Sequence, residues 1–405
     1  MINRPEYESR LINSQNEEVV KILTGVRRSG KSSLLRLLGK HLISGGLPEK
    51  NIIEINFEYP RFVELQNPAN FYLYVKERLP ESGPAFLFVD EVQELDEWAK
   101  TINGIRAEFN IDIYATGSNS RMFAGEHLTY LSGRYIPIEV YPLSFLEFFR
   151  FKGADPSDFS IHEALYNEYS SRGSFPAVVL AENADFAQAL LGGLYDSIYS
   201  RDILLRGKIR NETAFRRVAN YVFDNIGNPT SSNSIANTLK NAGHAITSDT
   251  VDSYLTLMGG AFLVYPCARY DLRGKELLKT NGKYYVVDSG LRNRVLGFRT
   301  SNHGHLSENM VFLELKRRGF DVNVGILGAA ELDFVAQSQG ARFYIQVSET
   351  ALDPKVLNRE IAPFSKLTDG YPRILITKDR VDYSTEGIRH INFYDFLLGA
   401  TLGKR

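Results

Sequence analysis

The sequence predicts an α/β fold, in which a mostly parallel sheet is covered by helices on both faces and a second α/β module follows later in the chain. Two observations carry this prediction. Apolar, strand-like segments alternate with helical segments through the first third of the sequence, and the alternation returns after about Ser307. Alternating strands and helices form parallel sheets because each crossover helix carries the chain back over one face. Between the two stretches the pattern is mainly helical.

These changes of pattern divide the 405 residues into four expected segments. A sheet-containing core over residues 1–143 is followed by a helical lid over 144–210. The order of three helices and a hairpin over 211–290 resembles a winged helix. Residues 291–405 then form the second α/β module.

The elements expected inside these segments follow from apolar spacing. In the core they are 19–24, 32–43, 51–57, 71–79, 86–90 and 111–116; in the lid 144–150, 161–172 and 186–203; in the winged segment helices 235–242 and 248–258 with strands 261–265 and 283–287; and in the last module 308–318, 321–325, 331–336, 342–348, 357–367 and 373–377.

Composition favours a soluble globular protein and excludes several classes of site. Hydrophobic residues make up 43% and charged residues 23%, which is enough apolar surface for more than one core. No run of about 18 uncharged apolar residues occurs, and the N-terminus resembles no signal peptide, so we expect a cytoplasmic protein with no membrane association. Cys267 is the only cysteine, which excludes an internal disulfide. A net charge of −1 gives no overall attraction to nucleic acid.

A glycine-rich segment between the first strand and the first long helix matches the phosphate-binding pattern Gly-x4-Gly-Lys-Ser. Its backbone N–H groups and the helix dipole favour phosphate, while Lys31 should reach the β- and γ-phosphates and Ser32 should ligate Mg²⁺. A mere glycine-rich turn is the competing interpretation. The sequence thus predicts ATP and Mg²⁺ as cofactors, bound by Gly25, Val26, Arg27, Arg28, Ser29, Gly30, Lys31, Ser32 and Ser33.

Two further strands end in polar residues that fit the same chemistry. Asp90 and Glu91 follow the apolar segment 86–89, where Asp90 should hold the hydrated metal and Glu91 should activate the attacking water. Ser118 and Asn119 follow the strand over 111–116 and should bond the γ-phosphate or that water. Acids that merely end a strand in a turn, and a plain Gly-Ser-Asn turn, are the alternatives.

Several motifs in combination resemble one family over nearly the whole chain. They are GVRRSGKSSLL, LFVDEVQ, ATGSNS, LSGRY before YPLSFLEF, GSFPAV, KYYVVDSGLRN, SEN, ELDFVA and YIQVS. The family is that of the predicted AAA+-superfamily P-loop ATPases of bacteria and archaea (AAA 14 type) with a C-terminal nuclease-like domain of unknown function. The resemblance implies ATP hydrolysis in a ring-like homo-oligomer, such as a hexamer, with Arg134 as an arginine finger. A structural arginine paired with a carboxylate is the alternative for Arg134.

The last module resembles the PD-(D/E)xK nuclease fold in the order of its polar residues. Glu308, Asp333 and Gln346 fall on a helix and two strands, as the metal-binding groups of that fold do. Ser348 stands where an active enzyme carries lysine, and a serine brings no positive charge. We therefore expect a vestigial metal site in a restriction-endonuclease-like domain that does not cut DNA.

Basic residues around the expected wing suggest contacts with DNA phosphates, although an exposed hairpin is often only a solvated face. The helix over 248–258 contains Asp249 and Asp252 and no lysine or arginine, which argues against reading of base sequence. We expect binding of duplex or branched DNA with little sequence preference, through Arg269, Arg273, Lys275, Lys279 and Lys283. An ATP-driven switch acting on a protein partner and an ATP-dependent nuclease are the alternative functions.

Overall fold

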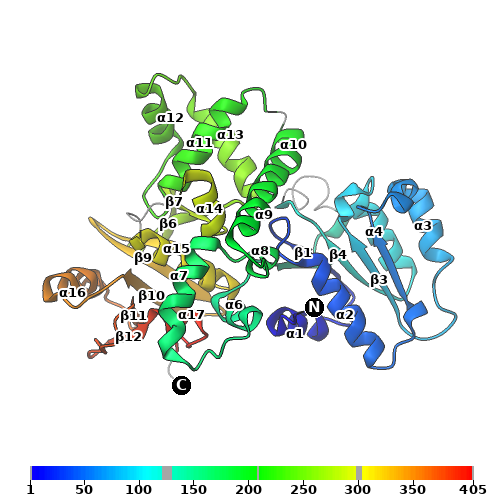
Figure 1. Cartoon of the computed structure of the whole chain (residues 1–405), viewed down its shortest axis with the longest axis horizontal. Coiled ribbons are helices and arrows are strands. Elements are labelled where there is room, and N and C mark those ends of the chain that lie inside the picture. The colour runs from blue at the N-terminus through cyan, green and yellow to red at the C-terminus, as the bar shows by residue number, and fades with distance from the viewer. Residues whose placement is uncertain (1, 121–129, 208, 298–302, 404–405) are drawn as a thin grey trace. The chain divides into compact units, whose positions relative to one another are not determined.

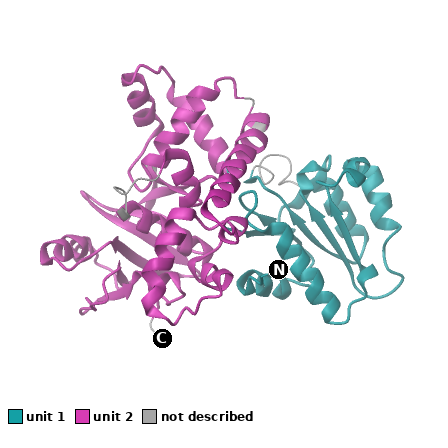
Figure 2. Cartoon of the chain, viewed as in Figure 1, with its two compact units in different colours: residues 1–142, 260–262 teal, residues 143–259, 263–405 magenta. Residues whose placement is uncertain are grey.

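A computed structural model describes residues 2–120, 130–207, 209–297 and 303–403, except for the side chains of residues 206, 279–281 and 303. The chain forms two compact units, coloured separately in Figure 2. Unit 1 comprises Met1–Pro142 with Gly260–Phe262, and unit 2 comprises Leu143–Gly259 with Leu263–Arg405. None of the helices in the described part of the chain has the length and apolar composition needed to cross a bilayer.

Unit 1 is built on a five-stranded parallel sheet with the order β2-β3-β4-β1-β5. Because every neighbouring pair is parallel, the carboxyl ends of all five strands meet at one edge (Figure 1). Strand β4 lies between β1 and β3, so the carboxyl end of β4 lies between the carboxyl ends of these two neighbours. The strands are β1 (Val20–Thr24), β2 (Ile52–Asn56), β3 (Ala85–Asp90), β4 (Ile111–Thr116) and β5 (Tyr135–Glu139).

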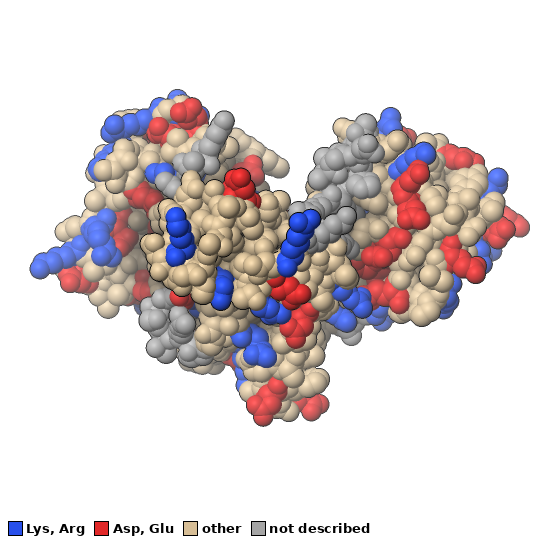
Figure 3. Space-filling model, turned by 90° about the horizontal axis from the view of Figure 1, so that it is seen from above, with Lys and Arg blue, Asp and Glu red and all other residues tan. Residues whose placement is uncertain are grey.

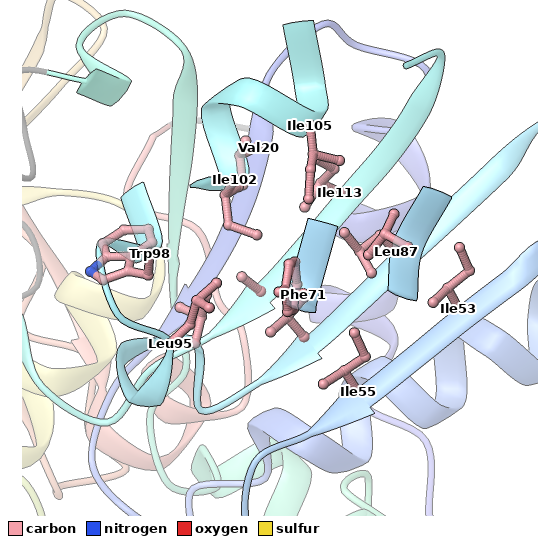
Figure 4. Packing of buried hydrophobic residues seen from close by; sticks show 14 of the residues in the cluster. Val20, Ile53, Ile55, Phe71, Leu87, Leu95, Trp98, Ile102, Ile105 and Ile113 are labelled. Atoms are coloured by element: carbon pink, nitrogen blue, oxygen red, sulfur yellow. The ribbon is translucent and has the colours of Figure 1, made fainter. Parts of the chain in front are cut away.

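Helices cover both faces of this sheet, as alternating strands and helices predict. One buried cluster packs strand residues such as Leu87 and Ile113 against Phe71 of α3 and Trp98 and Ile102 of α4 (Figure 4). A second cluster joins the other face to α1 and α2. The helices of unit 1 are α1 (Pro5–Asn13), α2 (Lys31–Ser44), α3 (Pro68–Lys76) and α4 (Trp98–Glu108), with short 3₁₀ segments η1 (Glu49–Asn51), η2 (Pro60–Gln66) and η3 (Val92–Glu94).

Unit 2 begins with helices, several of which start at a side-chain cap that the sequence provides. Ser144 and Glu147 form a capping box at α6, and Asn183, Asn211 and Asp288 cap α9, α11 and α14. The helical segments are α6 (Phe145–Lys152), η5 (Phe159–Ile161), α7 (His162–Arg172), α8 (Pro176–Val179), α9 (Ala184–Ser197), the π-helical η6 (Ile198–Leu204), α10 (Leu205–Gly207), α11 (Glu212–Asp224), α12 (Ser232–Asn241), α13 (Ser248–Gly260), α14 (Ser289–Leu296), α15 (His303–Arg317), α16 (Pro354–Ile361), η8 (Ala362–Lys366) and α17 (Phe393–Leu397).

A seven-stranded mixed sheet of order β12-β11-β10-β9-β8-β6-β7 lies in the same unit. Its strands are β6 (Val264–Asp271), β7 (Glu276–Val286), β8 (Asp321–Leu327), β9 (Ala330–Ser338), β10 (Ala341–Ser348), β11 (Arg373–Thr377) and β12 (Ile388–Asn392).

The hairpin β6–β7, where the sequence suggested a wing, is part of the seven-stranded sheet. The far half of β6, from Arg269 to Asp271, pairs in parallel with Val324–Ile326 of β8. The eight residues of β6 are long enough for one end to pair with β7 alone and the other end also with β8. The hairpin therefore continues the C-terminal sheet, and the boundary expected at residue 290/291 does not separate two sheets.

Candidate functional site

The phosphate-binding segment lies where the motif requires it, between the end of β1 and the first turn of α2. Gly25 and Gly30 have φ angles of 126° and 106°, a region that favours glycine. A Cβ atom on Gly25 would lie 2.3 Å from the carbonyl oxygen of Val140, so this position has no room for a side chain. The backbone turns sharply around the N-terminus of the 14-residue helix α2, which is a favourable position for an anion.

Polar groups of this loop are placed to receive a ligand. The Lys31 ammonium donates to the carbonyl oxygens of Gly25 and Val26, at 2.8 and 3.0 Å, and so lies against the loop itself. Ser32 and Ser33 are partly exposed in the first turn of α2. The buried hydroxyl of Ser29 has no hydrogen-bond partner among the described residues, a feature typical of a site completed by a ligand.

The three arginines at this loop have different surroundings. Arg28 is exposed, with φ at 65°, and Arg27 forms a 3.7 Å ion pair with Glu58. Arg4, which belongs to none of the sequence motifs, is buried and donates to the carbonyl oxygens of Ser29 at 2.8 Å and Tyr141 at 3.0 Å. Its guanidinium thus ties the segment before α1 to the phosphate-binding loop.

The ends of β2, β3 and β4 meet in one hydrogen-bonded cluster beside this loop. Thr116 at the end of β4 donates its hydroxyl to Asp90 and accepts the backbone N–H of Glu91 at 3.0 Å. Asn56 at the end of β2 donates to the other Asp90 oxygen at 2.9 Å. The sequence analysis did not predict Thr116 and Asn56 as site residues. Each ends a strand of a parallel sheet, and the carboxyl ends of parallel strands share one edge.

Glu91 leaves the sheet in an unusual backbone conformation. Its φ of 57° is in the left-handed region, and its carboxylate accepts hydrogen bonds from Ser118, at 3.3 Å, and Gln93. Ser118 and Asn119 are buried at the end of β4. Within the described residues, no lysine or arginine forms an ion pair with Asp90 or Glu91.

Arg134 lies at the opposite edge of the sheet from the phosphate-binding loop. Its carbonyl oxygen accepts the N–H of Val20, at the amino end of β1, whereas the loop follows the carboxyl end. Five strand residues separate the two edges by roughly 16 Å. The Arg134 side chain is exposed and has no ion pair among the described residues. It is therefore far from the loop of its own subunit.

The acids selected in the last module lie around a lysine. The Lys283 ammonium is 2.9 Å from Glu308 of α15, 2.9 Å from Glu331 and 3.9 Å from Asp333, both of β9. Only 4% of the Lys283 side chain is exposed, so its assignment to an exposed wing was wrong. The positions of the basic residues in the sequence suggested a basic hairpin. They could not show that the side chain of Lys283 is buried.

Electrostatics in this cluster follow from burial and close charges. Burial and the Glu308 charge raise the pKa of Asp333 to about 8, in spite of Lys283. Burial alone would raise the pKa of Glu308, but His305, Lys283 and Tyr285 outweigh it and lower that pKa. Burial would lower the pKa of Lys283, and the surrounding carboxylates raise it instead. Lys283 is thus a permanent cation at pH 7.

Gln346 and Ser348 do not complete a metal site. The Gln346 carbonyl accepts the backbone N–H of Asp333 at 3.1 Å, and its amide donates to Glu360 at 3.2 Å, so this side chain braces β9 and α16. Ser348 donates to the carbonyl oxygen of Thr350. Across the described part of the chain, no three His, Cys, Asp or Glu side chains are arranged to hold a metal ion.

The remaining basic residues of the hairpin differ in their exposure. Arg273 and Lys275 are exposed at its turn and Arg269 is half-buried, while the Lys279 side chain lies outside the described residues. Basic and acidic side chains are interspersed on the face drawn in Figure 3. Any affinity for a polyanion on that face depends on local contacts.

Two family models and two relatives match this chain. A model described as an AAA domain matches residues 17–149, and a model of a domain of unknown function matches residues 163–302. An uncharacterized protein of Haemophilus influenzae is 37% identical over 400 residues, which cover 98% of this chain and 99% of that protein. This chain belongs to that protein's family. An uncharacterized protein of Methanocaldococcus jannaschii is 30% identical over 98% of this chain and 88% of its own length.

The AAA domain of this family member contains the phosphate-binding loop and the acidic strand end described above, and it is the domain of a P-loop ATPase. Among solved structures, the chain is similar to a Walker-type ATPase of Pyrococcus abyssi, with 14% identity, a TM-score of 0.43 and coverage of 73% of this chain and 96% of that one. It is also similar to the Aeropyrum pernix ORC1 protein in complex with DNA, with 12% identity, a TM-score of 0.33 and coverage of 73% and 92%.

Proposed function

We propose that this protein binds ATP with Mg²⁺ at the carboxyl edge of the unit 1 sheet and hydrolyses it, with Glu91 as the base that activates water. The observation that carries the proposal is the cluster in which Thr116 joins Asp90 to the backbone of Glu91, beside a loop with the phosphate-binding motif. Hydrolysis needs a phosphate cradle, a metal-orienting acid and a second acid for water. Here the cradle follows β1 and both acids follow β3, with β4 between these two strands.

Each residue has a distinct part in this proposal. Lys31 and the loop N–H groups hold the phosphates, and Ser32 and Asp90 would hold Mg²⁺, directly and through its water molecules. The metal would neutralise charge that develops on the phosphates. Ser118 already donates to the Glu91 carboxylate, which restricts the orientation of that group. Asp90 is fixed by Asn56 and Thr116, so it does not need to be ordered when the metal binds.

Nucleotide binding is tested first with Lys31→Ala, matched by Lys40→Ala, which removes an exposed lysine of the same helix. We expect Lys31→Ala to abolish binding of a fluorescent ATP analogue and Lys40→Ala to keep it. Equal affinities of both variants and the wild type would show that the loop is not the phosphate site.

We propose further that ATP turnover takes place in a homo-oligomeric ring, in which Arg134 of one subunit reaches the nucleotide of its neighbour. Its distance from the loop of its own subunit supports an action across a subunit boundary, because a finger must lie close to the γ-phosphate. Size-exclusion chromatography with light scattering, with and without ATP and Mg²⁺, tests the assembly. A protein that stays monomeric in both conditions contradicts this part of the proposal.

DNA is the partner that we propose for unit 2, bound through phosphates with little sequence preference. Arg273 and Lys275, exposed at the β6–β7 turn, support it. Replacing both with alanine should reduce the slope of log affinity against log salt by about 0.9 for each lost duplex phosphate contact. Lys355→Ala with Lys366→Ala, two exposed lysines elsewhere in unit 2, should leave the slope unchanged.

A switch that acts on a protein partner remains the second candidate, favoured by the net charge of −1 and by the interspersed charges on the face in Figure 3. The two candidates differ in what stimulates ATP turnover. Stimulation by duplex or branched DNA supports the first. Turnover that no DNA changes, at low salt, supports the second.

A further inference from the structure

The acid cluster of unit 2 contains its own cation. Glu308, Glu331 and Asp333 come from a helix and a strand that are distant in sequence from β7, yet all three carboxylates lie within 3.9 Å of the Lys283 ammonium. Tyr285, two residues along β7 on the same face, also donates its hydroxyl to Glu308. Both side chains are buried, so this contact is made away from bulk water.

Asp333 and Glu308 also have partners other than Lys283. The second oxygen of Asp333 accepts the N–H of Val347 at 2.8 Å, and the second oxygen of Glu308 faces His305 at 3.8 Å. Glu308 and Asp333 thus each have a polar or charged group within 3.9 Å of both oxygens. A buried charge is tolerated only when it is paired and hydrogen-bonded, and Lys283 and these acids meet that condition for one another.

A divalent metal does not fit in this arrangement. Mg²⁺ requires oxygen ligands at about 2.1 Å in an octahedron. The two closest carboxylate oxygens lie 2.9 Å from the Lys283 nitrogen, a spacing set by N–H···O hydrogen bonds. A metal ion at the same centre would overlap the ammonium and be repelled by its charge.

We infer that Lys283 permanently occupies the cation position among Glu308, Glu331 and Asp333, and that this internal ammonium keeps divalent metal out of the last module. The cluster serves to join β7, α15 and β9, since each contributes a charge to it. One explanation then covers both the absence of a lysine at position 348 and the presence of Lys283. The acids of the module stabilise its fold and do not bind a catalytic metal. This inference is independent of ATP hydrolysis in unit 1.

The first test uses the wild type and Asp333→Asn, titrated with Mn²⁺ in the absence of nucleotide and followed by calorimetry. Asparagine resembles the protonated acid that the raised pKa of Asp333 favours, so we expect this variant to fold. Identical Mn²⁺ binding by the two proteins supports the inference. A Mn²⁺ site in the wild type that Asp333→Asn weakens tenfold or more overturns it.

The second test removes the internal cation with Lys283→Met, which keeps the length of the side chain but not its charge. The variant should melt at a lower temperature than the wild type, because the acids lose their counter-charge. Mn²⁺ at about a hundredfold excess over its Kd should raise the melting temperature by roughly 5–10 °C. The same ion should have no such effect on the wild type or on Lys275→Met, the matched change at an exposed lysine of the same hairpin.

The double variant Lys283→Met/Asp333→Asn assigns the effect to this cluster, because it should lose the Mn²⁺-dependent rise. A folded Lys283→Met protein that Mn²⁺ does not stabilise would overturn the inference. If Lys283→Met does not fold without metal, folding on addition of Mn²⁺ supports the inference, and failure to fold with it leaves the decision to the comparison of wild type with Asp333→Asn.

Discussion

Unit 1 and unit 2 each place acids at the end or along the side of a buried strand, but they balance the acids' charge in different ways. In unit 1, Asp90 is held by the neutral groups of Thr116 and Asn56, and Lys31 bonds to backbone carbonyls of its own loop. In unit 2, Lys283 pairs directly with the acids. The acids of unit 1 are therefore not paired with a cation among the described residues, whereas the negative charge of the unit 2 acids is already balanced by Lys283.

Whether acids beside a strand can bind a metal ion therefore depends on whether the protein already supplies a positive charge next to them. Both regions match a motif in sequence, and each places an aspartate on a strand, Asp90 on β3 and Asp333 on β9. Only the structure shows that the unit 2 cluster is closed by a lysine 25 residues before Glu308 in the chain.

The largest effect is expected at Arg134, because this residue would place a positive charge beside the nucleotide of a neighbouring subunit. Arg134→Ala should lower ATP turnover by on the order of a thousandfold, since a finger stabilises charge that develops only in the transition state. Arg78→Ala, at another exposed arginine of unit 1, should leave turnover unchanged. Mixing Arg134→Ala with Lys31→Ala subunits should restore part of the activity. No recovery in an assembly shown to exchange subunits would make Arg134 a structural residue.

A smaller loss is expected when the neutral donor in unit 1 is removed. Thr116→Val deletes the hydroxyl that donates to Asp90 and accepts from the Glu91 backbone. Hydrogen bonds to charged groups contribute about 1.5–3 kcal/mol, which corresponds to a loss of turnover of roughly tenfold to a hundredfold. Thr116→Ser keeps the hydroxyl and should retain most of the activity. Equal rates for the valine and serine variants would contradict the positioning role.

Much of this contrast was predictable from the sequence, and the part that was not has a physical reason. The strands and helices of unit 1 that carry the motifs were predicted within a few residues, because β1, β3 and β4 are short apolar runs and α2 has a helical period. Glu308 and Asp333, which the sequence suggested as metal-binding groups, both lie near Lys283. The partner Lys283 was not, since the pairing depends on how β7 approaches β9 across the sheet and no local pattern encodes it.

The sequence also did not predict helix α1, strand β12 or helix α17. Helix α1 buries only Tyr7 and Leu11, so its sequence reads as polar. Its function in the fold comes from Arg4, just before the helix, whose hydrogen bonds span 25 and 137 residues. Strand β12 was missed because its sequence IRHIN has only two apolar residues, and helix α17 was missed because five residues are too few to show a helical period. Such contacts become visible only when the chain is folded.

The smallest effect on chemistry, and a clear effect on stability, is expected at Arg4. Arg4→Ala leaves the buried carbonyl groups of Ser29 and Tyr141 without this donor, which should cost about 3 kcal/mol. Urea unfolding followed by the fluorescence of Trp98, the only tryptophan and one buried in unit 1, measures the loss. Arg10→Ala, on an exposed position of α1, should change stability by less than about 0.5 kcal/mol. Equal midpoints for the two variants would show that Arg4 does not hold the loop.

The most direct test of the central claim is the rate of Mg²⁺-dependent ATP hydrolysis by two glutamate-to-glutamine variants, one from each acid cluster. Glu91→Gln should keep ATP bound and lower turnover by roughly a hundredfold or more, because the water loses its base. Glu331→Gln, in the cluster that Lys283 closes, should hydrolyse ATP within about twofold of the wild type. Turnover by Glu91→Gln at the wild-type rate, or a comparable loss in both variants, would contradict the assignment of the two clusters.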